Sequence, residues 1–209
     1  MAVERRILLA TRSKGKLREL SGILAEAGLS GINLDEAGIE ESADEEHIEC
    51  FETFEENSLA KARYFSRLSR MPTMADDSGL SVMSLGGAPG VYSKRYSGRS
   101  DLSGQDLDDA NNAKLLTELE GYRDASAKYV CAAAYVDEDL EEVAIGESFG
   151  RIVREPLGSN GFGYDPYFFS AELGETFGQA STEAKQVVSH RGRAFRALVQ
   201  ALRQRGLTL

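Results

Sequence analysis

Residues 74–80 have the sequence Met74-Ala75-Asp76-Asp77-Ser78-Gly79-Leu80, which sets two adjacent carboxylates and a hydroxyl beside a glycine. Neighbouring like charges resist burial, so a pocket that holds both needs a cation or a proton to offset them. Asp, Ser and Gly are also the common residues of surface turns. The stretch alone therefore leaves two interpretations open, an exposed turn or an acidic pocket that binds a cation.

The apolar residues before the two aspartates predict a short strand over Pro72–Ala75 that brings Asp76 and Asp77 to its carboxyl end. Ligands bind at that edge of open α/β sheets. Other elements follow from hydrophobic periodicity and from capping and stop residues. They are a strand over Ile7–Ala10, helices over 17–27, 54–68, 106–119 and 181–206, and strands over 129–136 and 143–149.

Composition narrows the classes of protein. The 209 residues are 42% hydrophobic and 28% charged, as in an ordinary globular protein. There is no apolar run long enough to span a membrane and no signal-peptide pattern at the N-terminus, so we expect a cytoplasmic protein. Two cysteines without CxxC spacing and only two histidines argue against a disulfide framework, a zinc site and a histidine-rich metal centre. A formal charge of −10 argues against binding to a nucleic-acid backbone.

Polar or basic side chains that suit an anionic ligand occur at three further places in the sequence. Thr11–Lys16 lies between a predicted strand and a helix start, so it is either a phosphate loop or a solvated first turn. Lys61 lies on a mostly apolar helix stripe and points either to solvent or into a cleft. Lys185, His190 and Arg191 begin the last predicted helix, where they form either an anion-binding cluster or a solvated basic face.

The glycine-rich segment Gly158–Pro166 lacks the spacing of a dinucleotide fingerprint and leads into Tyr167-Phe168-Phe169 instead of a helix. A Rossmann interpretation is therefore rejected. Its glycines allow the backbone to approach a ligand closely, and Phe162 could stack on a flat ring. The alternative is a glycine-rich hairpin loop.

The order of motifs TxxxxK, TFxENxxxKA, ADDSGL, GGAPGVYSxRY, GFGYDP and KxxxSHRxxA resembles the inosine triphosphate pyrophosphatase family, over nearly the whole chain from Ile7 to about Leu202. The resemblance implies hydrolysis of ITP, dITP and XTP to the nucleoside monophosphate and pyrophosphate. It also implies one α/β domain over 1–209, with an elongated mixed sheet flanked by helices and a nucleotide cleft between two lobes. Mg²⁺ dependence and a homodimer are further implications.

The resemblance also implies roles for individual residues. Asp77 matches the general base and a metal ligand, Glu49 a second metal carboxylate, and Asp76 a further support of the metal. Lys61 matches a phosphate contact, and the Thr11–Lys16 segment matches the triphosphate loop. The implied substrate-binding residues are Thr11, Arg12, Ser13, Lys14, Gly15, Lys16, Lys61, Ser78, Phe162, Gly163, Tyr164, Asp165, Lys185, His190 and Arg191.

One residue departs from the family pattern. The family usually has Asn at the position of Ser13, and serine keeps a hydroxyl but loses the reach and second function of the amide. Two alternative functions remain. One is a related pyrophosphatase for other modified nucleotides, against which GFGYDP and SHR argue; the other is a non-catalytic nucleotide-binding regulator, against which the pair Asp76-Asp77 argues.

Overall fold

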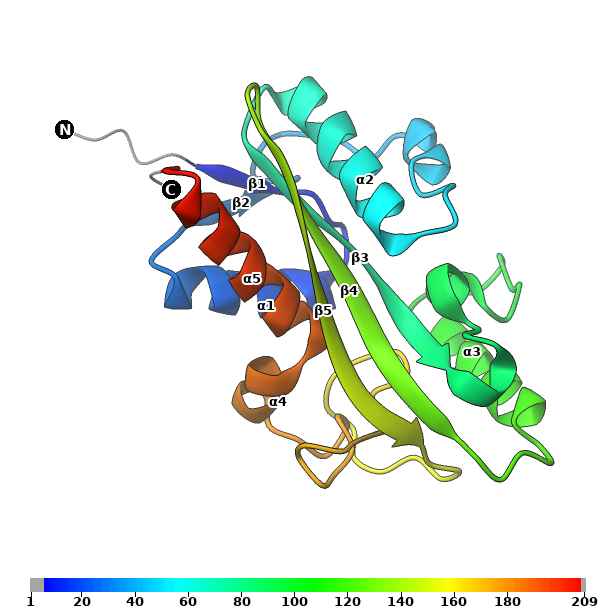
Figure 1. The fold of residues 1–209 in the computed structure, drawn as a ribbon. Helices are drawn as coiled ribbons and strands as arrows, with labels where there is room; N and C mark the ends of the chain where they lie inside the picture. The colour runs from blue at the N-terminus through cyan, green and yellow to red at the C-terminus, as the bar shows by residue number, and fades with distance from the viewer. Residues whose placement is uncertain (1–5, 208–209) are drawn as a thin grey trace. The chain divides into compact units, whose positions relative to one another are not determined.

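Six strands form one mixed sheet in the order β2-β1-β3-β4-β5-β6 in the computed structural model, which describes residues 6–207 (Figure 1). β1 pairs in parallel with β2 and with β3, whereas β5 and β6 are antiparallel. The strands are β1 Ile7–Leu9, β2 Gly31–Asn33, β3 Thr73–Val82, β4 Ser126–Val136, β5 Glu141–Ile152 and β6 Phe168–Ser170. The α-helices are α1 Lys14–Glu26, α2 Phe54–Ser69, α3 Gly104–Glu118, α4 Thr182–Val188 and α5 His190–Gln204. Short 3-10 helices occur at Ala43–His47, Met83–Leu85 and Gly90–Arg95. The predicted α/β class with a mixed sheet and flanking helices is confirmed.

The described chain divides into two compact units that are interleaved along the sequence. The first unit contains residues 6–77, 131–146 and 191–207, and the second contains 78–130 and 147–190. Three strands, β3, β4 and β5, begin in one unit and end in the other.

Strand alternation gives the first unit a core on each face of its part of the sheet. Met74, together with Ile7 and Leu9, packs in a buried cluster with apolar residues of α1 and α5. Ala75, one residue further, packs with Ala62 and other residues of α2. Consecutive strand residues point to opposite faces, so α1 and α5 cover one face and α2 the other (Figure 1).

The second unit has one buried cluster of its own. It joins Leu80 and Val82 of β3 to Leu115 and Leu119 at the end of α3, and continues into aromatic residues. The aromatic members are Tyr129, Tyr164, Phe168 and Phe177. Rings of Tyr129 and Phe168 lie 4.7 Å apart, so the segment after β5 is anchored by aromatic packing.

Two sequence predictions are wrong in detail. The strand expected to end at Ala75 continues to Val82, because Leu80 and Val82 are also buried, so Asp76 and Asp77 lie within β3 instead of at its end. The helix expected over 181–206 is two helices, α4 and α5, separated by Ser189 with extended backbone angles (φ −67°, ψ 147°). Val187 and Val188, which precede Ser189, have low helix propensity, so ending a helix there costs little free energy.

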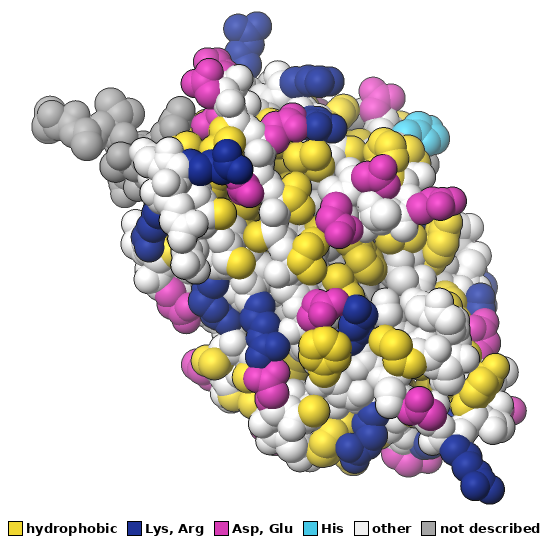
Figure 2. Space-filling view, in the orientation of Figure 1, with side chains coloured by type: hydrophobic (Ala, Val, Ile, Leu, Met, Phe, Trp, Pro, Cys, Tyr) yellow, Lys and Arg dark blue, Asp and Glu magenta, His cyan; other side chains and the backbone are white. Residues whose placement is uncertain are grey.

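Surface charge agrees with the mixed composition. Basic and acidic side chains are interspersed over the face shown in Figure 2, and the described residues drawn there form no basic stripe of the kind that follows a nucleic-acid backbone. In the described part of the chain, no helix has the length and apolar character required to cross a membrane.

Candidate active site

Asp76 and Asp77 point to opposite faces of β3. Asp76 has the same orientation as Met74, toward α1 and α5, and Asp77 that of Ala75, toward α2. Their partners agree with this, since Asp76 pairs with Lys16 at the start of α1 and Asp77 accepts a hydrogen bond from Asn57 of α2. The two adjacent carboxylates are therefore separated by the strand itself, and each has its own environment.

Asp76 is fully buried in a network of cations. Its Oδ2 lies 3.1 Å from Lys16 Nζ and 3.1 Å from Arg191 Nε, and Arg191 also pairs with Glu19 of α1. Burial would raise the pKa of Asp76, but the charges of Lys16, Arg191 and Lys61 outweigh it and hold the pKa far below its ordinary value. Asp76 is thus ionised and fixes the position of Lys16.

Asp77 has the opposite shift. Its Oδ2 accepts a hydrogen bond of 3.0 Å from Asn57 Nδ2, and Asn57 is itself held by the backbone of Phe51. Burial raises the pKa of Asp77, and the negative charge of Glu49 adds to this, against the charges of Lys16 and Lys61. A carboxylate with a raised pKa is a better proton acceptor than an ordinary aspartate.

Lys61 and Glu49 complete this part of the site. The Lys61 ammonium donates to the Glu49 carboxylate and, at 2.6 Å, to the backbone carbonyl of Asp76. Burial would raise the pKa of Glu49, but the charges of Lys61 and Lys16 outweigh it and lower the pKa. Of the two interpretations of Lys61, the inward-pointing one is therefore correct.

The Thr11–Lys16 segment is ordered by its own side chains. Ser13 is the N-cap of α1, with its Oγ accepting the Lys16 N–H at 3.4 Å, and Thr11 Oγ1 accepts the Ser13 N–H at 3.2 Å. Arg12 is bound to Glu45 at 2.7 Å, whereas Lys14 is exposed. Lys16 is consequently the residue of this segment that reaches Asp76, and the segment also includes Gly15 at the first turn of α1.

Ser13 supplies the N-cap of α1. Serine and asparagine are both strong N-cap residues, because each places a side-chain oxygen against the free N–H groups of the first turn. The departure from the family pattern therefore keeps the helix cap that orients Lys16.

In the second unit, Asp165 organises the glycine-rich segment. It is buried and accepts hydrogen bonds from Lys185 Nζ (2.7 Å), the Phe162 N–H (2.8 Å) and the Tyr129 hydroxyl (3.4 Å). The Lys185 ammonium also lies 5.0 Å from the centre of the Phe162 ring. Gly161 is required here, because a Cβ at its position would lie 2.0 Å from the Asp165 carboxylate.

The second unit also contains four further residues predicted to bind substrate: Ser78, Gly163, Tyr164 and His190. The His190 ring stacks on Tyr129 with centroids 4.5 Å apart, and the Tyr164 hydroxyl donates to the Ser93 carbonyl at 2.8 Å. Ser78 follows Asp77 directly in β3. Gly163 is bonded on both sides by α3, as described below.

Several residues of these networks were not assigned by sequence reasoning. Asn57, which contacts Asp77, lies one turn before Lys61 on the same face of α2, and this i, i+4 spacing is the signal in the sequence that could have found it. Glu19 of α1, Cys131 of β4 and the polar residues of α3 gave no such signal. Cys131 Sγ lies 3.9 Å from Asp76 Oδ2 and is fully buried.

The carboxylates of Asp77 and Glu49 suit a hard divalent cation. No group of three or more His, Cys, Asp or Glu side chains suited to a metal occurs within residues 6–207. Mg²⁺ does not require one, because it keeps several waters and is usually bound through one or two carboxylates and the phosphates of its substrate. The negative charge of Glu49 raises the pKa of Asp77, so the two carboxylates interact electrostatically. The fit is to a hydrated ion shared with a phosphate ligand.

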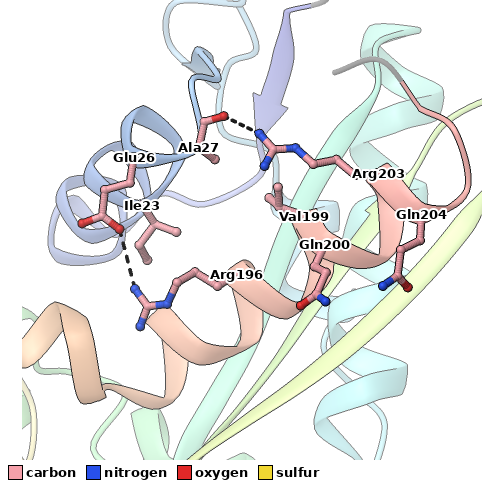
Figure 3. Close-up of a pocket in the computed structure, with 8 residues that line it drawn as sticks. All are labelled: Ile23, Glu26, Ala27, Arg196, Val199, Gln200, Arg203 and Gln204. Atoms are coloured by element: carbon pink, nitrogen blue, oxygen red, sulfur yellow. Dashed lines mark hydrogen bonds and ion pairs between the residues drawn. The ribbon is translucent and has the colours of Figure 1, made fainter.

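A surface pocket lies elsewhere in the first unit. It has a volume of about 540 Å³ and is formed by α1 and α5 (Figure 3). Arg196 and Arg203 of α5 reach across it to Glu26 (3.7 Å) and to the Ala27 carbonyl (2.6 Å) of the facing segment. None of the residues singled out in the sequence lines it, so we interpret it as a packing groove bridged by one ion pair and one hydrogen bond.

Comparison with known proteins places these observations in a family. The model of the Ham1 family matches residues 7–201. The dITP/XTP pyrophosphatase of Ralstonia nicotianae is 46% identical, over 95% of this chain and 97% of that protein. A HAM1 protein from Coxiella burnetii superposes with a TM-score of 0.81 at 33% identity, over 96% of this chain and 99% of that one. The structure titled nucleoside-triphosphatase / dITP/XTP pyrophosphatase from Mycobacterium abscessus is 39% identical with a TM-score of 0.70, over 94% and 99%. The chain therefore belongs to the Ham1 family.

Proposed function

We propose that the protein hydrolyses ITP, dITP and XTP to the nucleoside monophosphate and pyrophosphate, and so removes non-standard purine nucleotides. The names of its relatives, dITP/XTP pyrophosphatase, support this assignment. The observation that supports it best is Asp77, a buried carboxylate with a raised pKa beside a second carboxylate and two lysines. These are the groups that cleavage of a phosphoanhydride requires.

In this proposal the residues of the first unit bind the triphosphate and act on water. Lys16 and Lys61 balance phosphate charge, and their ammonium groups are held in place by Asp76 and Glu49. Asp77 accepts a proton from a water whose oxygen attacks the α-phosphorus, while the bond from that phosphorus to the bridging oxygen breaks and pyrophosphate leaves. Asn57 orients Asp77 for this step.

Mg²⁺ is the proposed cofactor, held by Asp77 and Glu49. When bound, it supplies positive charge to the phosphate oxygens and favours the departure of pyrophosphate. The family resemblance also implies that Asp76 supports the metal. Its ion pairs with Lys16 and Arg191 favour a role in positioning those cations.

The residues of the second unit are proposed to bind the base. Phe162, held by Asp165 and Lys185, would stack on the purine ring. Hypoxanthine and xanthine present an oxygen at position 6 where adenine presents an amino group. Donors that match this oxygen leave adenine with an unmatched contact, and such mismatches discriminate by about 10⁴-fold. His190 and Lys185 are the proposed donors.

A homodimer, implied by the family resemblance, and a cytoplasmic location, expected from the sequence, complete the proposal. The dimer is tested by the molar mass of the purified protein in solution, measured by light scattering. A mass near that of one chain would exclude it.

A product assay tests the proposed reaction. The protein is incubated with Mg²⁺ and separately with ITP, XTP, dITP, ATP, GTP and dTTP, and monophosphate, pyrophosphate and free phosphate are quantified. We expect monophosphate with pyrophosphate from the first three only. Diphosphate with free phosphate would mean attack at the terminal phosphorus, turnover of dTTP would indicate a pyrophosphatase for other nucleotides, and binding without turnover would indicate a regulator.

A further inference from the structure

Gly163 of the glycine-rich segment is bonded through both of its backbone polar groups to one helix. Its N–H donates to Asp108 Oδ2 at 2.8 Å, and its carbonyl accepts from Asn112 Nδ2 at 3.1 Å. Asp108 and Asn112 are four residues apart on α3, so they lie on the same face of that helix. The orientation of the Gly163 peptide groups is therefore set by α3.

This arrangement is unusual for a helix packed against a core. Of the three buried residues of α3, two are asparagines, Asn111 and Asn112, and the third is Leu115. Asn111 bonds a different segment, accepting from the Ser97 N–H and donating to the Lys94 carbonyl. The buried face of α3 thus binds loop backbone in two places, where apolar packing would be the ordinary solution.

The surroundings of Asp108 disfavour its charged form. Burial raises its pKa, Asp109 and Asp165 add to this, and the hydrogen bond from Gly163 and the charge of Lys94 oppose it. Fixing a backbone N–H with a carboxylate in these surroundings costs free energy, because the charge must be desolvated. A hydrogen bond to a neutral acceptor would avoid that cost. Its bond is directed at the residue next to Phe162, the proposed stacking residue.

We propose that Asp108 and Asn112 are positioning residues for base recognition. By fixing the Gly163 peptide groups they set the direction in which the chain enters Phe162 on one side and Tyr164 on the other. The inference rests on the proposed function, in which this segment binds the purine. It predicts that loss of either side chain weakens binding of the nucleoside part of the substrate and leaves triphosphate binding unchanged.

The test compares Asp108→Ala, Asp108→Asn and Asn112→Leu with the wild type. Asp109→Ala is the matched control, since Asp109 is an exposed aspartate of the same helix that accepts a hydrogen bond from Gln105. KM and kcat are measured with ITP, and inorganic triphosphate, which has no base, is used as a competitive inhibitor. We expect Asp108→Ala and Asn112→Leu to raise KM about tenfold with kcat and the inhibition constant unchanged.

The conservative variant separates positioning from stability. In Asp108→Asn the amide oxygen can still accept the Gly163 N–H, so KM should stay close to that of the wild type. A KM unchanged in Asp108→Ala and Asn112→Leu would overturn the proposal. So would an equal weakening of inorganic triphosphate inhibition, because that result would indicate a general loss of structure.

Hydrogen–deuterium exchange gives a readout that does not depend on turnover. Asp108→Ala should speed exchange in the peptide that covers residues 160–165, while Asp109→Ala should not. If the wild type hydrolysed none of the purine triphosphates, the proposed function would fail, and this measurement would still decide whether α3 orders the segment. Equal exchange in wild type and Asp108→Ala would overturn the inference alone.

Discussion

At the scale of single residues, two neighbouring aspartates have pKa values shifted in opposite directions. Cations lower the pKa of Asp76, and burial raises that of Asp77, because β3 directs one side chain toward Lys16 and Arg191 and the other toward Asn57. The residue types do not indicate this difference in pKa, since both residues are aspartates in one motif. It follows from the alternation of side chains along a strand. The raised pKa is consistent with Asp77 as the proposed general base.

Replacement of Asp77 tests that assignment. Asp77→Asn should lower kcat for ITP by about 10² to 10⁴-fold, because it removes the proton acceptor. The folded pKa of Asp77 lies above its ordinary value, so its ionised form is disfavoured by folding at neutral pH, and the variant should unfold at a temperature no lower than that of the wild type. Activity and thermal unfolding measure the two effects, with Asp109→Asn as the control. Wild-type kcat in Asp77→Asn would remove Asp77 as the base.

The two cysteines should differ sharply in reactivity. Burial raises the pKa of the Cys131 thiol, and the charge of Asp76 adds to the shift, whereas Cys50 is exposed. The thiolate is the reactive form, so a thiol reagent at pH 8 should label Cys50 in the native protein and both cysteines after denaturation in urea. Mass spectrometry of the labelled protein gives the count. Labelling of Cys131 in the native protein would contradict its burial beside Asp76.

At the scale of elements, the sequence predicts most of the helices and strands and misplaces two boundaries. Capping and stop residues are local signals of helix ends: the Thr53 hydroxyl accepts the Glu56 N–H at the start of α2, and Gly28 follows α1 with φ +71°. The continuation of β3 beyond Ala75 and the break at Ser189 depend on packing partners far away in sequence. Asp108 and Asn112 were missed for the same reason, because their contact is with a residue more than 50 positions away.

The cap of α1 can be tested by substitution. Ser13→Ala should lower the free energy of unfolding by about 1 kcal/mol, because the first-turn N–H of Lys16 loses its acceptor. Ser13→Asn, which restores the residue usual in the family, should keep the wild-type stability. Urea unfolding at neutral pH measures both variants. A Ser13→Ala variant as stable as the wild type would show that the cap contributes nothing.

At the scale of the whole molecule, the candidate functional residues are divided between two units with separate cores. Lys16, Lys61 and Asp77 belong to the first unit, and Phe162 and Asp165 belong to the second. The clusters around them share no buried apolar residue. Binding of phosphate and binding of base should therefore respond to different substitutions.

This division predicts that substitutions in the two units have separable effects on phosphate binding and on binding of the nucleobase. Lys16→Gln should weaken inhibition by inorganic triphosphate and raise the KM for ITP, because one phosphate contact is lost. Phe162→Leu should raise the KM for ITP and leave inhibition by inorganic triphosphate unchanged. Thermal unfolding verifies that both variants are folded, which matters for Lys16 because Asp76 is buried beside it. Weaker inorganic triphosphate inhibition in Phe162→Leu would contradict the division.

The interleaving of the two units limits how the protein can be re-engineered. The second unit consists of two insertions, 78–130 and 147–190, into the chain of the first. A transplant of the second unit, the proposed base-binding unit, from one relative to another therefore needs two simultaneous segment exchanges, with four junctions inside or beside secondary structure. One junction falls between Asp77 and Ser78, so a chimera must be joined at the peptide bond that follows Asp77, the proposed general base. Changes of specificity in this scaffold are better sought by point substitution on α3 and the glycine-rich segment than by recombination of blocks.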